Sequence, residues 1–169
     1  MELMIPGLIL VALMVYLSTR IKRTAAEAFA REEIDTGEFS LVKPEGFINP
    51  VKDASEYAFE AYSKDYGRDA AGNLPQASIT VKRHGSDLES VYESARGSLT
   101  DPETIGSDGD EFVVRGRGTE GSTAAEVYYK LVRAGSAVYE FRTCALTDHA
   151  ADFRERLRQT ADSFAVRPR

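Results

Sequence analysis

The sequence predicts an α+β domain, an antiparallel sheet of five to six strands packed by helices, behind one N-terminal transmembrane helix. Three observations lead to this prediction. An apolar run opens the chain, segments of alternating apolar residues fill most of the remainder, and two segments with helical spacing interrupt and close it. The expected boundaries are a transmembrane helix over 1–19, a juxtamembrane helix or linker over 20–36, and a soluble α+β domain over 37–169.

The first 19 residues form an apolar run that is long enough to cross a bilayer as a helix, which takes about 20 residues. Between Leu3 and Leu17, only Pro6 and Gly7 interrupt it. Tyr16 stands where an interfacial aromatic anchor is expected. The residues predicted to form the membrane anchor are Leu3, Leu8, Ile9, Leu10, Leu13, Val15, Tyr16 and Leu17.

Ala26-Glu27-Ala28 resembles the cleavage site of a secretory signal, but the charges argue against export. A signal peptide carries its positive charges before the apolar run, where this chain has only Glu2. The positive charges Arg20, Lys22 and Arg23 follow the run instead. By the positive-inside rule, we expect a retained single-pass signal-anchor in a bacterial inner membrane, with the N-terminus outside and the C-terminal domain in the cytoplasm.

Residues 20–36 consist largely of good helix formers, with Glu27 and Arg31 spaced as an i, i+4 pair. We expect the membrane helix to continue through them and to stop near Gly37. One stripe of this helix is either a face for a partner or a surface that packs on the chain's own domain. Its residues are Ile21, Ala25 and Phe29.

The first half of the domain contains three segments that read as strands. Residues 38–47 alternate and then turn at Pro44-Glu45-Gly46. Residues 55–67 fit both strand and helix spacing, and their aromatic content favours a strand. Residues 67–75 are expected to form a loop, and 76–85 a clear strand.

Two segments have the apolar spacing of amphipathic helices. The first begins at a capping box, Ser86 to Glu89, and stops at Gly97. The second is expected to begin at Thr147 or Asp148. Their apolar stripes are Leu88, Val91, Tyr92 and Ala95 in the first, and Phe153, Leu157, Ala161 and Phe164 in the second.

Between the two helices, the sequence predicts a loop, a strand and a hairpin. Residues 100–111 are acidic and rich in Gly and Pro, so we expect an exposed loop, followed by a strand over 111–118. Residues 126–146 are expected to form a hairpin whose apolar residues share one face. Leu131 then lies opposite Tyr139, which requires a three-residue loop at Ala134-Gly135-Ser136.

Composition excludes several classes of function. The net charge is −6, and because residues 1–23 carry +2, the rest of the chain carries −8. Such an acidic body repels phosphate backbones, so we predict no nucleic-acid partner. The single Cys144 excludes an intramolecular disulfide and a cysteine-cluster zinc site.

No motif of known chemistry stands in a convincing context, so we predict no catalytic residue, no cofactor and no metal. The stretch from Gly116 to Gly121 matches a dinucleotide-binding fingerprint, which would have to be followed by a helix. The residues that follow it favour a strand instead, so we interpret the glycines as a turn between two strands. His84 and His149 are far apart in sequence, and Cys144 is interpreted as a packed thiol. We interpret the acids Asp101, Glu103, Asp108, Asp110 and Glu111 as a solvated loop, with calcium binding as the alternative. We interpret the arginines Arg115, Arg117, Arg133 and Arg142 as scattered surface charges, with a basic stripe as the alternative. We expect core positions for some of the tyrosines and a protein interface as the alternative for exposed ones, among Tyr57, Tyr62, Tyr66, Tyr92, Tyr128, Tyr129 and Tyr139.

Three segments together resemble the PsbP-like fold superfamily, over residues 38–167. They are FSLVKPEGF as the opening strand and bend, SDLESVYESA as the middle helix, and AVYEFRTCAL with ADFRERLRQTADSFAV as the last strand and terminal helix. Asp162-Ser163-Phe164, with Phe164 anchoring the helix end, is the most suggestive part. The resemblance implies a binding or assembly module without enzymatic activity.

The expected function is that of an accessory or assembly subunit of a larger membrane complex, respiratory or photosynthetic. Its partners would be the lipid bilayer and integral membrane subunits. The alternative is a membrane-tethered sensor that binds a small ligand or ion.

Overall fold

A computed structural model describes residues 14, 16, 27–50, 55–67 and 74–167. None of the helices in these ranges is both long enough and apolar enough to span a membrane. Of the predicted anchor residues, only Tyr16 is described, and it is helical and exposed. The other anchor residues and the charges Arg20, Lys22 and Arg23 lie outside the described ranges, so the anchor and its orientation stay predictions.

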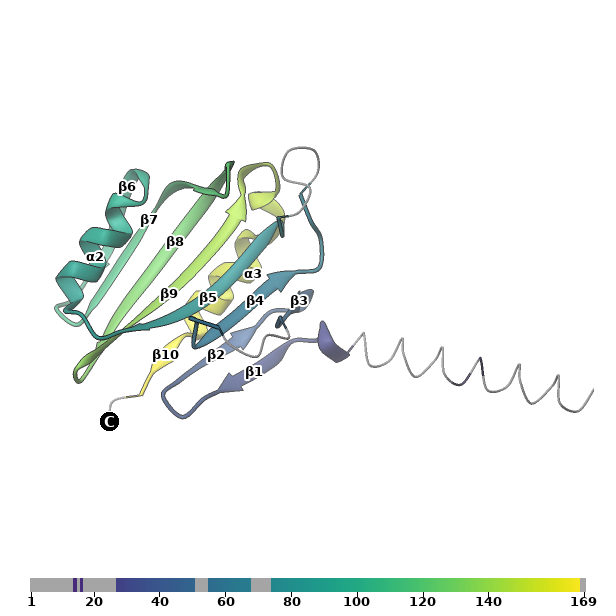
Figure 1. Ribbon diagram of the computed structural model, residues 1–169, viewed down its shortest axis with the longest axis horizontal. Helices are drawn as coiled ribbons and strands as arrows, with labels where there is room; N and C mark the ends of the chain where they lie inside the picture. Colours follow the sequence, from purple (N-terminus) through teal and green to yellow (C-terminus); the bar gives the residue numbers. More distant parts are fainter. Residues whose placement is uncertain (1–13, 15, 17–26, 51–54, 68–73, 168–169) are drawn as a thin grey trace, which may run out of the picture.

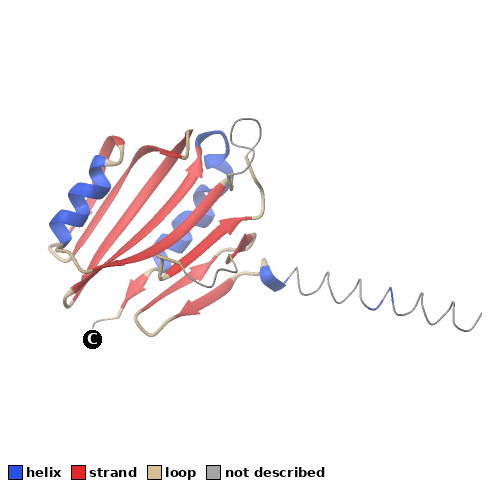
Figure 2. Ribbon diagram, in the orientation of Figure 1, coloured by secondary structure: helices blue, strands red, loops and turns tan. Residues whose placement is uncertain are grey.

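The described residues form two antiparallel sheets and two α-helices, which confirms the α+β class (Figures 1 and 2). The main sheet has seven strands in the order β3-β4-β5-β9-β8-β7-β6, and the small sheet has three in the order β1-β2-β10. The prediction of five to six strands was therefore too low. The strands are β1 Glu32–Asp35, β2 Phe39–Lys43, β3 Phe47–Ile48, β4 Phe59–Ser63, β5 Ala77–His84, β6 Thr100–Ser107, β7 Glu111–Glu120, β8 Thr123–Ala134, β9 Ala137–Leu146 and β10 Ala165–Val166.

The helix predicted to run to Gly37 ends earlier, because β1 pairs with β2. Helical residues are described at Glu27 and Ala28, and a hairpin follows. Gly37 has φ +81°, the left-handed conformation that glycine adopts without strain, so it closes this hairpin instead of a helix. The Gly37 backbone N–H and the Arg167 guanidinium hold the pKa of the Asp35 carboxyl below its usual range.

The acidic segment predicted as a loop contains β6, an edge strand of the main sheet. Its register with β7 shifts twice, and Asp101 has φ +53°, so the strand is irregular. Pro102 is tolerated because it lies on a sheet edge. The breaker-rich composition therefore indicates an edge strand with bulges, which discourages pairing with other chains.

The β8–β9 hairpin differs from its predicted register by one residue. Ala134 pairs with Ala137, which leaves a two-residue turn, and Leu131 lies opposite Glu140. The apolar residues of the two strands therefore point to opposite faces. Val127 and Leu131 belong to one core cluster, and Tyr139 and Phe141 belong to the other. A single apolar face was the wrong assumption, because each face of this sheet is covered by its own helix.

The two helices lie close to their predicted positions. α2 (Leu88–Gly97) is capped by Asp87, whose carboxylate accepts a hydrogen bond from the Ser90 backbone N–H. The cap is therefore one residue later than the predicted capping box. α3 (Ala150–Ser163) follows a short 3₁₀ helix at Thr147–His149, so it begins slightly after the predicted start.

Each helix completes a separate hydrophobic core. α3 packs beside β2, β5 and β9 over an aromatic cluster in which the Phe141 and Phe164 rings stack 4.9 Å apart. α2 packs on β7, β8 and β9 over smaller aliphatic residues. This second core contains Leu88, Val91, Ala95, Val114, Ala125, Val127, Tyr129, Leu131, Val138 and Cys144.

The glycine motif from Gly116 to Gly121 lies in β7 and in the turn after it. A side chain at Gly116 would come within 3.1 Å of the Thr100 carbonyl oxygen. This glycine therefore lets the connection after α2 approach β7 closely, which gives it a packing role.

Candidate functional site

The two helices cover opposite faces of the main sheet, and each leaves part of its face open. α3 lies over β5, β9 and β8, so β6 and β7 are uncovered on that face. α2 lies over β7, β8 and β9, so β4 and β5 are uncovered on the other face. Figure 1 shows this offset, with α2 at the end of the sheet that carries β6 and β7, and with β5 and β9 passing in front of α3.

The uncovered part of the α3 face forms a groove of about 730 Å³ between α3 and strands β6, β7 and β8. This volume lies within the usual range of binding sites, about 300–1,000 Å³. The residues that line the groove come from five elements. They are Asp101, Glu103 and Ile105 of β6, Arg115, Gly116 and Arg117 of β7, Glu126, Val127 and Tyr128 of β8, Thr143 and Ala145 of β9, and Ala150, Arg154, Leu157, Arg158, Ala161 and Asp162 of α3.

The groove is hollow because its floor consists mainly of small residues. Ala145 of β9 and Ala150 and Ala161 of α3 occupy positions where larger side chains would fill the space. Leu157 lies beside them on α3. Ile105 of β6 forms part of the outer wall and is 46% exposed. An apolar side chain that entered the groove would thus contact apolar surface on two sides.

Tyr128 supplies the main polar group of the floor. Burial, together with the nearby carboxylates of Glu111 and Asp162, raises the pKa of its hydroxyl to about 12, so it stays protonated at neutral pH. Among the described residues, no hydrogen-bond partner of this hydroxyl is found. It can therefore donate a hydrogen bond to an acceptor that enters the groove.

The rim carries four arginines and four acids, which makes the groove electrically neutral within an acidic domain. On the sheet side, Arg117 pairs with Asp101, and Arg115 lies 2.8 Å from Glu103. On the helix side, the nearest acid to Arg154 is Glu126, at 3.7 Å, and the Arg154 side chain is 68% exposed. Arg154 is therefore the arginine of the rim whose acid partner is the most distant.

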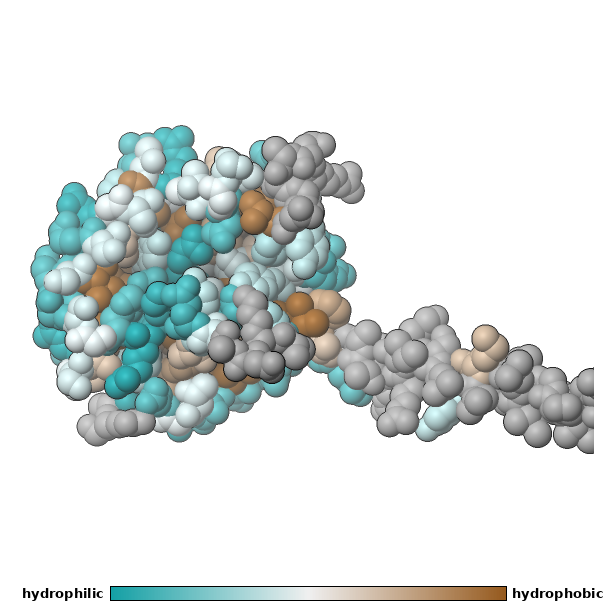
Figure 3. All heavy atoms as spheres, in the orientation of Figure 1, coloured by the Kyte–Doolittle hydropathy of each residue, from teal (hydrophilic) through white to brown (hydrophobic). Residues whose placement is uncertain are grey.

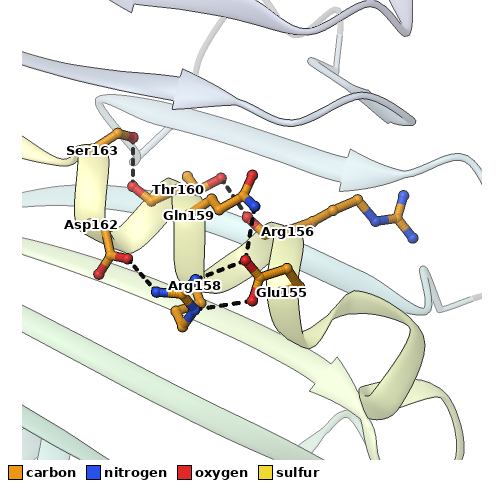
Figure 4. A network of polar contacts seen from close by, with 7 residues as sticks. All are labelled: Glu155, Arg156, Arg158, Gln159, Thr160, Asp162 and Ser163. Carbon is orange, nitrogen blue, oxygen red and sulfur yellow. Dashed lines mark hydrogen bonds and ion pairs between the residues drawn. The ribbon is translucent and has the colours of Figure 1, made fainter.

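Arg158, the other arginine of the helix wall, is held by neighbours on α3 (Figure 4). Its guanidinium donates to both carboxylate oxygens of Glu155 and to Asp162. The hydrogen bonds from Arg158 and Gln159 lower the pKa of Glu155 to about 2. This network keeps the helix wall in one arrangement, which reduces the entropy lost when a ligand binds.

The part of the other face that lies beside α2, which we name the polar half-face, carries paired charges from β5, β9 and the last residue of β7. His84 Nε2 lies 2.9 Å from Glu140, and Arg142 lies 2.8 Å from Glu120. Lys82 Nζ lies 2.6 Å from Glu56 and also lies over the Tyr57 ring. Figure 3, seen from this side, shows mostly hydrophilic residues with scattered apolar ones. The charged side chains of this half-face are therefore paired with one another.

The structure places the residues singled out in the sequence in several different surroundings. Phe29 is half-buried in a turn, and its carbonyl accepts a hydrogen bond from Gly46, while Ile21 and Ala25 are outside the described ranges. Cys144 is buried, and burial raises the pKa of its thiol to about 12, which supports its interpretation as a packed thiol.

The charged and aromatic groups are divided between the two faces. Asp101 and Glu103 pair with arginines instead of sharing an ion site, and no group of metal-ligating side chains is found among the described residues. The arginines do not form one stripe, because Arg115 and Arg117 line the groove whereas Arg142 lies on the polar half-face. Tyr66 is the most exposed tyrosine of the domain, and Tyr129 and Tyr139 are core residues.

Sequence reasoning missed both the groove and the pairing of His84 with Glu140. A signal for the groove was present on the last helix, where Arg154, Leu157, Arg158 and Ala161 share one stripe. This stripe combines small and charged residues, which indicates a helix face that is only partly covered. The His84–Glu140 pair depends on the pairing of β5 with β9, which joins residues far apart in the chain.

Solved structures of other proteins have the same fold. Cyanobacterial PsbP (CyanoP) from Synechocystis sp. PCC 6803 superposes with a TM-score of 0.51 at 12% identity, covering 82% of this chain and 94% of that one. LpqN, described as involved in cell envelope biogenesis of Mycobacterium tuberculosis, gives a TM-score of 0.55 at 13% identity, covering 82% and 91%. No protein-family model matches the sequence, and no curated protein matches it either.

These similarities show that the chain has a PsbP-like fold, as the sequence resemblance predicted. At such low identity, the similarity establishes the arrangement of the elements and not the activity.

Proposed function

We propose that this protein is a non-enzymatic accessory or assembly subunit of a larger membrane complex and that it binds its partner through the groove between α3 and β6–β8. The observation that carries the proposal is the groove itself, which combines an apolar floor, an arginine-bearing rim and the Tyr128 hydroxyl, for which the described part of the chain offers no hydrogen-bond partner. The PsbP-like fold supports an accessory or envelope role by analogy only.

We further propose that residues 1–19 anchor the chain in a bacterial inner membrane, with the N-terminus outside and the domain in the cytoplasm. The charges Arg20, Lys22 and Arg23 support this orientation. Anchoring raises the effective concentration of the domain beside a membrane partner, so weak contacts in the groove suffice. If a reporter fused after Arg169 were active only outside the cytoplasm, this orientation would be wrong.

The groove lies away from the side of the domain at which the predicted anchor is attached. The end of the N-terminal helix is joined to the β2–β3 turn, where the Gly46 backbone N–H donates to the Phe29 carbonyl and Lys43 donates to the Ala28 carbonyl. The groove lies over β6, at the opposite edge of the main sheet from β3. A partner in the groove therefore does not compete with the surface next to the anchor.

Site-specific photo-crosslinking in cells tests the proposal. A photoreactive phenylalanine analogue at Ile105, in the groove wall, should crosslink an integral membrane subunit that mass spectrometry identifies. The matched control is the same analogue at Tyr66, which is similarly exposed at 56% and does not line the groove. Crosslinking of the same subunit from both positions, or from neither, would contradict binding through the groove.

A second candidate function is that of a tethered sensor for a small ligand, favoured by a groove volume that suits a small molecule. Native mass spectrometry of the purified full chain distinguishes the two. A stoichiometric bound metabolite, lost when Ala161 is replaced by Phe, would favour the sensor.

A further inference from the structure

We propose that the groove recognises a partner segment in which an apolar side chain stands close to an acidic one, with the apolar group on the alanine floor and the carboxylate against Arg154. This inference rests on the proposed function, because it describes the segment by which the partner is bound. It assigns separate roles to the floor, the rim and the Tyr128 hydroxyl.

The alanine floor favours an apolar side chain of the partner segment. Ala145, Ala150 and Ala161 leave the hollow, and Leu157 provides apolar surface beside it. All four are almost fully buried, at 3–8% exposure, so the floor is a rigid part of the core. A leucine or phenylalanine side chain that enters it buries apolar surface without having to displace a side chain.

The arginines of the rim determine that the partner's charged side chain, next to its apolar one, is acidic. Three of the four arginines have a close acid partner, Arg115 with Glu103, Arg117 with Asp101, and Arg158 with Glu155 and Asp162. Arg154 has only the looser contact with Glu126 at 3.7 Å. An incoming carboxylate thus gains most at Arg154, where it can form a charge-assisted hydrogen bond without breaking a strong pair.

The Tyr128 hydroxyl adds a third requirement, a hydrogen-bond acceptor on the partner segment. Its hydroxyl remains a donor at neutral pH, and among the described residues nothing accepts from it. A peptide supplies carbonyl oxygens along its whole length, so an extended or helical segment can satisfy this donor while its side chains occupy the floor and rim.

The mixed charge of the rim favours a peptide over a lipid. Asp101, Glu103, Glu126 and Asp162 stand on the same rim as the arginines and would repel the phosphate of a lipid headgroup. A peptide avoids these positions through the spacing of its own side chains. The lipid is therefore the competing occupant that the experiment has to detect.

Selection of phage-displayed nine-residue random peptides on the full chain in detergent micelles tests the inference. The selected peptides should contain Asp or Glu within about four residues of Leu, Ile, Phe or Met, the distance over which side chains share one helix face. For a synthetic peptide from this set, Arg154→Glu should weaken binding by about tenfold or more, because like charges then face each other.

Two further variants separate the roles. Arg154→Lys should retain binding within about threefold, since the charge is kept and only the fork geometry is lost. Tyr128→Phe should weaken binding by about three- to tenfold, as expected for one net hydrogen bond. The matched control is Arg96→Glu on α2, an exposed helix arginine with a similarly loose partner at 3.9 Å, which should change nothing.

Three results would overturn the inference. They are selected peptides without an acidic preference, a selection that yields no peptide sensitive to Arg154→Glu, and a co-purifying lipid, seen by native mass spectrometry, that the peptides displace. The proposed function fails separately, if the crosslinker at Ile105 captures no membrane subunit. A captured subunit whose crosslinked segment lacks the apolar and acidic pair would leave that function standing and remove only this inference.

Discussion

The groove and the polar half-face are two parts of one sheet that no helix covers, yet they differ in what lies beneath their charges. Both carry arginine–carboxylate pairs, Arg117 with Asp101 on the groove rim and Arg142 with Glu120 on the polar half-face. The groove pair is about 70% exposed on each side chain, whereas the other pair is 20% and 30% exposed. Under the groove lie alanines, and on the polar half-face lie buried polar residues such as Glu60 and Thr80.

The difference teaches that an uncovered sheet face is not by itself a binding surface. On the polar half-face the side chains satisfy one another, so a ligand would have to break these pairs. In the groove the charges stand at the edge of an apolar hollow, so a ligand can enter without breaking them. Stability and binding should therefore depend on different halves of the sheet.

The largest expected effect is a loss of stability in the core beneath α3, the part of the sheet that a helix covers. Phe141→Ala should lower the free energy of unfolding by about 3–5 kcal/mol, because it removes a fully buried ring that stacks on Phe164. Denaturant unfolding followed by circular dichroism measures this loss. Leu131→Ala, the matched deletion beneath α2, should cost about 2–5 kcal/mol. A loss below about 1 kcal/mol in either variant would show that its helix does not close a core.

The second effect compares the two arginine pairs directly. Glu120→Gln should destabilise the fold by about 1–3 kcal/mol, because it leaves the half-buried Arg142 guanidinium without its carboxylate. Asp101→Asn, at the exposed groove pair, should cost less than about 0.5 kcal/mol. Equal losses in the same unfolding assay would remove the distinction between the two halves.

The third effect is electrostatic and concerns the helix wall of the groove. The hydrogen bonds from Arg158 and Gln159 lower the pKa of Glu155 to about 2, against an ordinary value of 4.5. A lowered folded-state pKa stabilises the fold above the ordinary value and loses that contribution as the pH falls towards 2. In Arg158→Gln, NMR titration should find the Glu155 pKa closer to 4.5, and an unchanged pKa would show that the wall is not held by this network.

The smallest effect should be found at Arg154. Arg154→Glu should change the free energy of unfolding by less than about 0.5 kcal/mol, since the side chain is exposed and its acid partner is distant. Binding of the selected peptide should fall in the same protein. A variant that lost binding and stability together would mean that Arg154 supports the fold and that the groove is not an independent site.

Much of the fold could be predicted from local patterns. Both helices, the strands β2, β4 and β5 and the existence of the β8–β9 hairpin follow from apolar spacing. The PsbP-like resemblance, carried by three sequence segments, agrees with the fold. The errors arose where a distant segment decides the structure. Glu32–Asp35 has helical composition but pairs with β2, and Thr100–Ser107 has loop composition but pairs with β7.

The groove could not be predicted, because it depends on where two helices lie on a sheet. The one-residue error in the hairpin has the same origin. The prediction assumed that helices cover only one face of the sheet, so Leu131 and Tyr139 had to lie on that face. Because a helix covers each face, Leu131 lies on one face and Tyr139 on the other. The position of α2 on the second face comes from tertiary packing, which single-segment periodicity does not contain.

The small sheet has a mechanical consequence. Its strands come from both ends of the domain, because β1 and β10 both pair with β2, and Arg167 lies 2.6 Å from Asp35. The segment that follows the helical residues Glu27 and Ala28 and the segment that follows α3 are thus tied to the same strand. A force applied between them would load this short sheet first and leave the main sheet, with its groove, intact until the small one had opened.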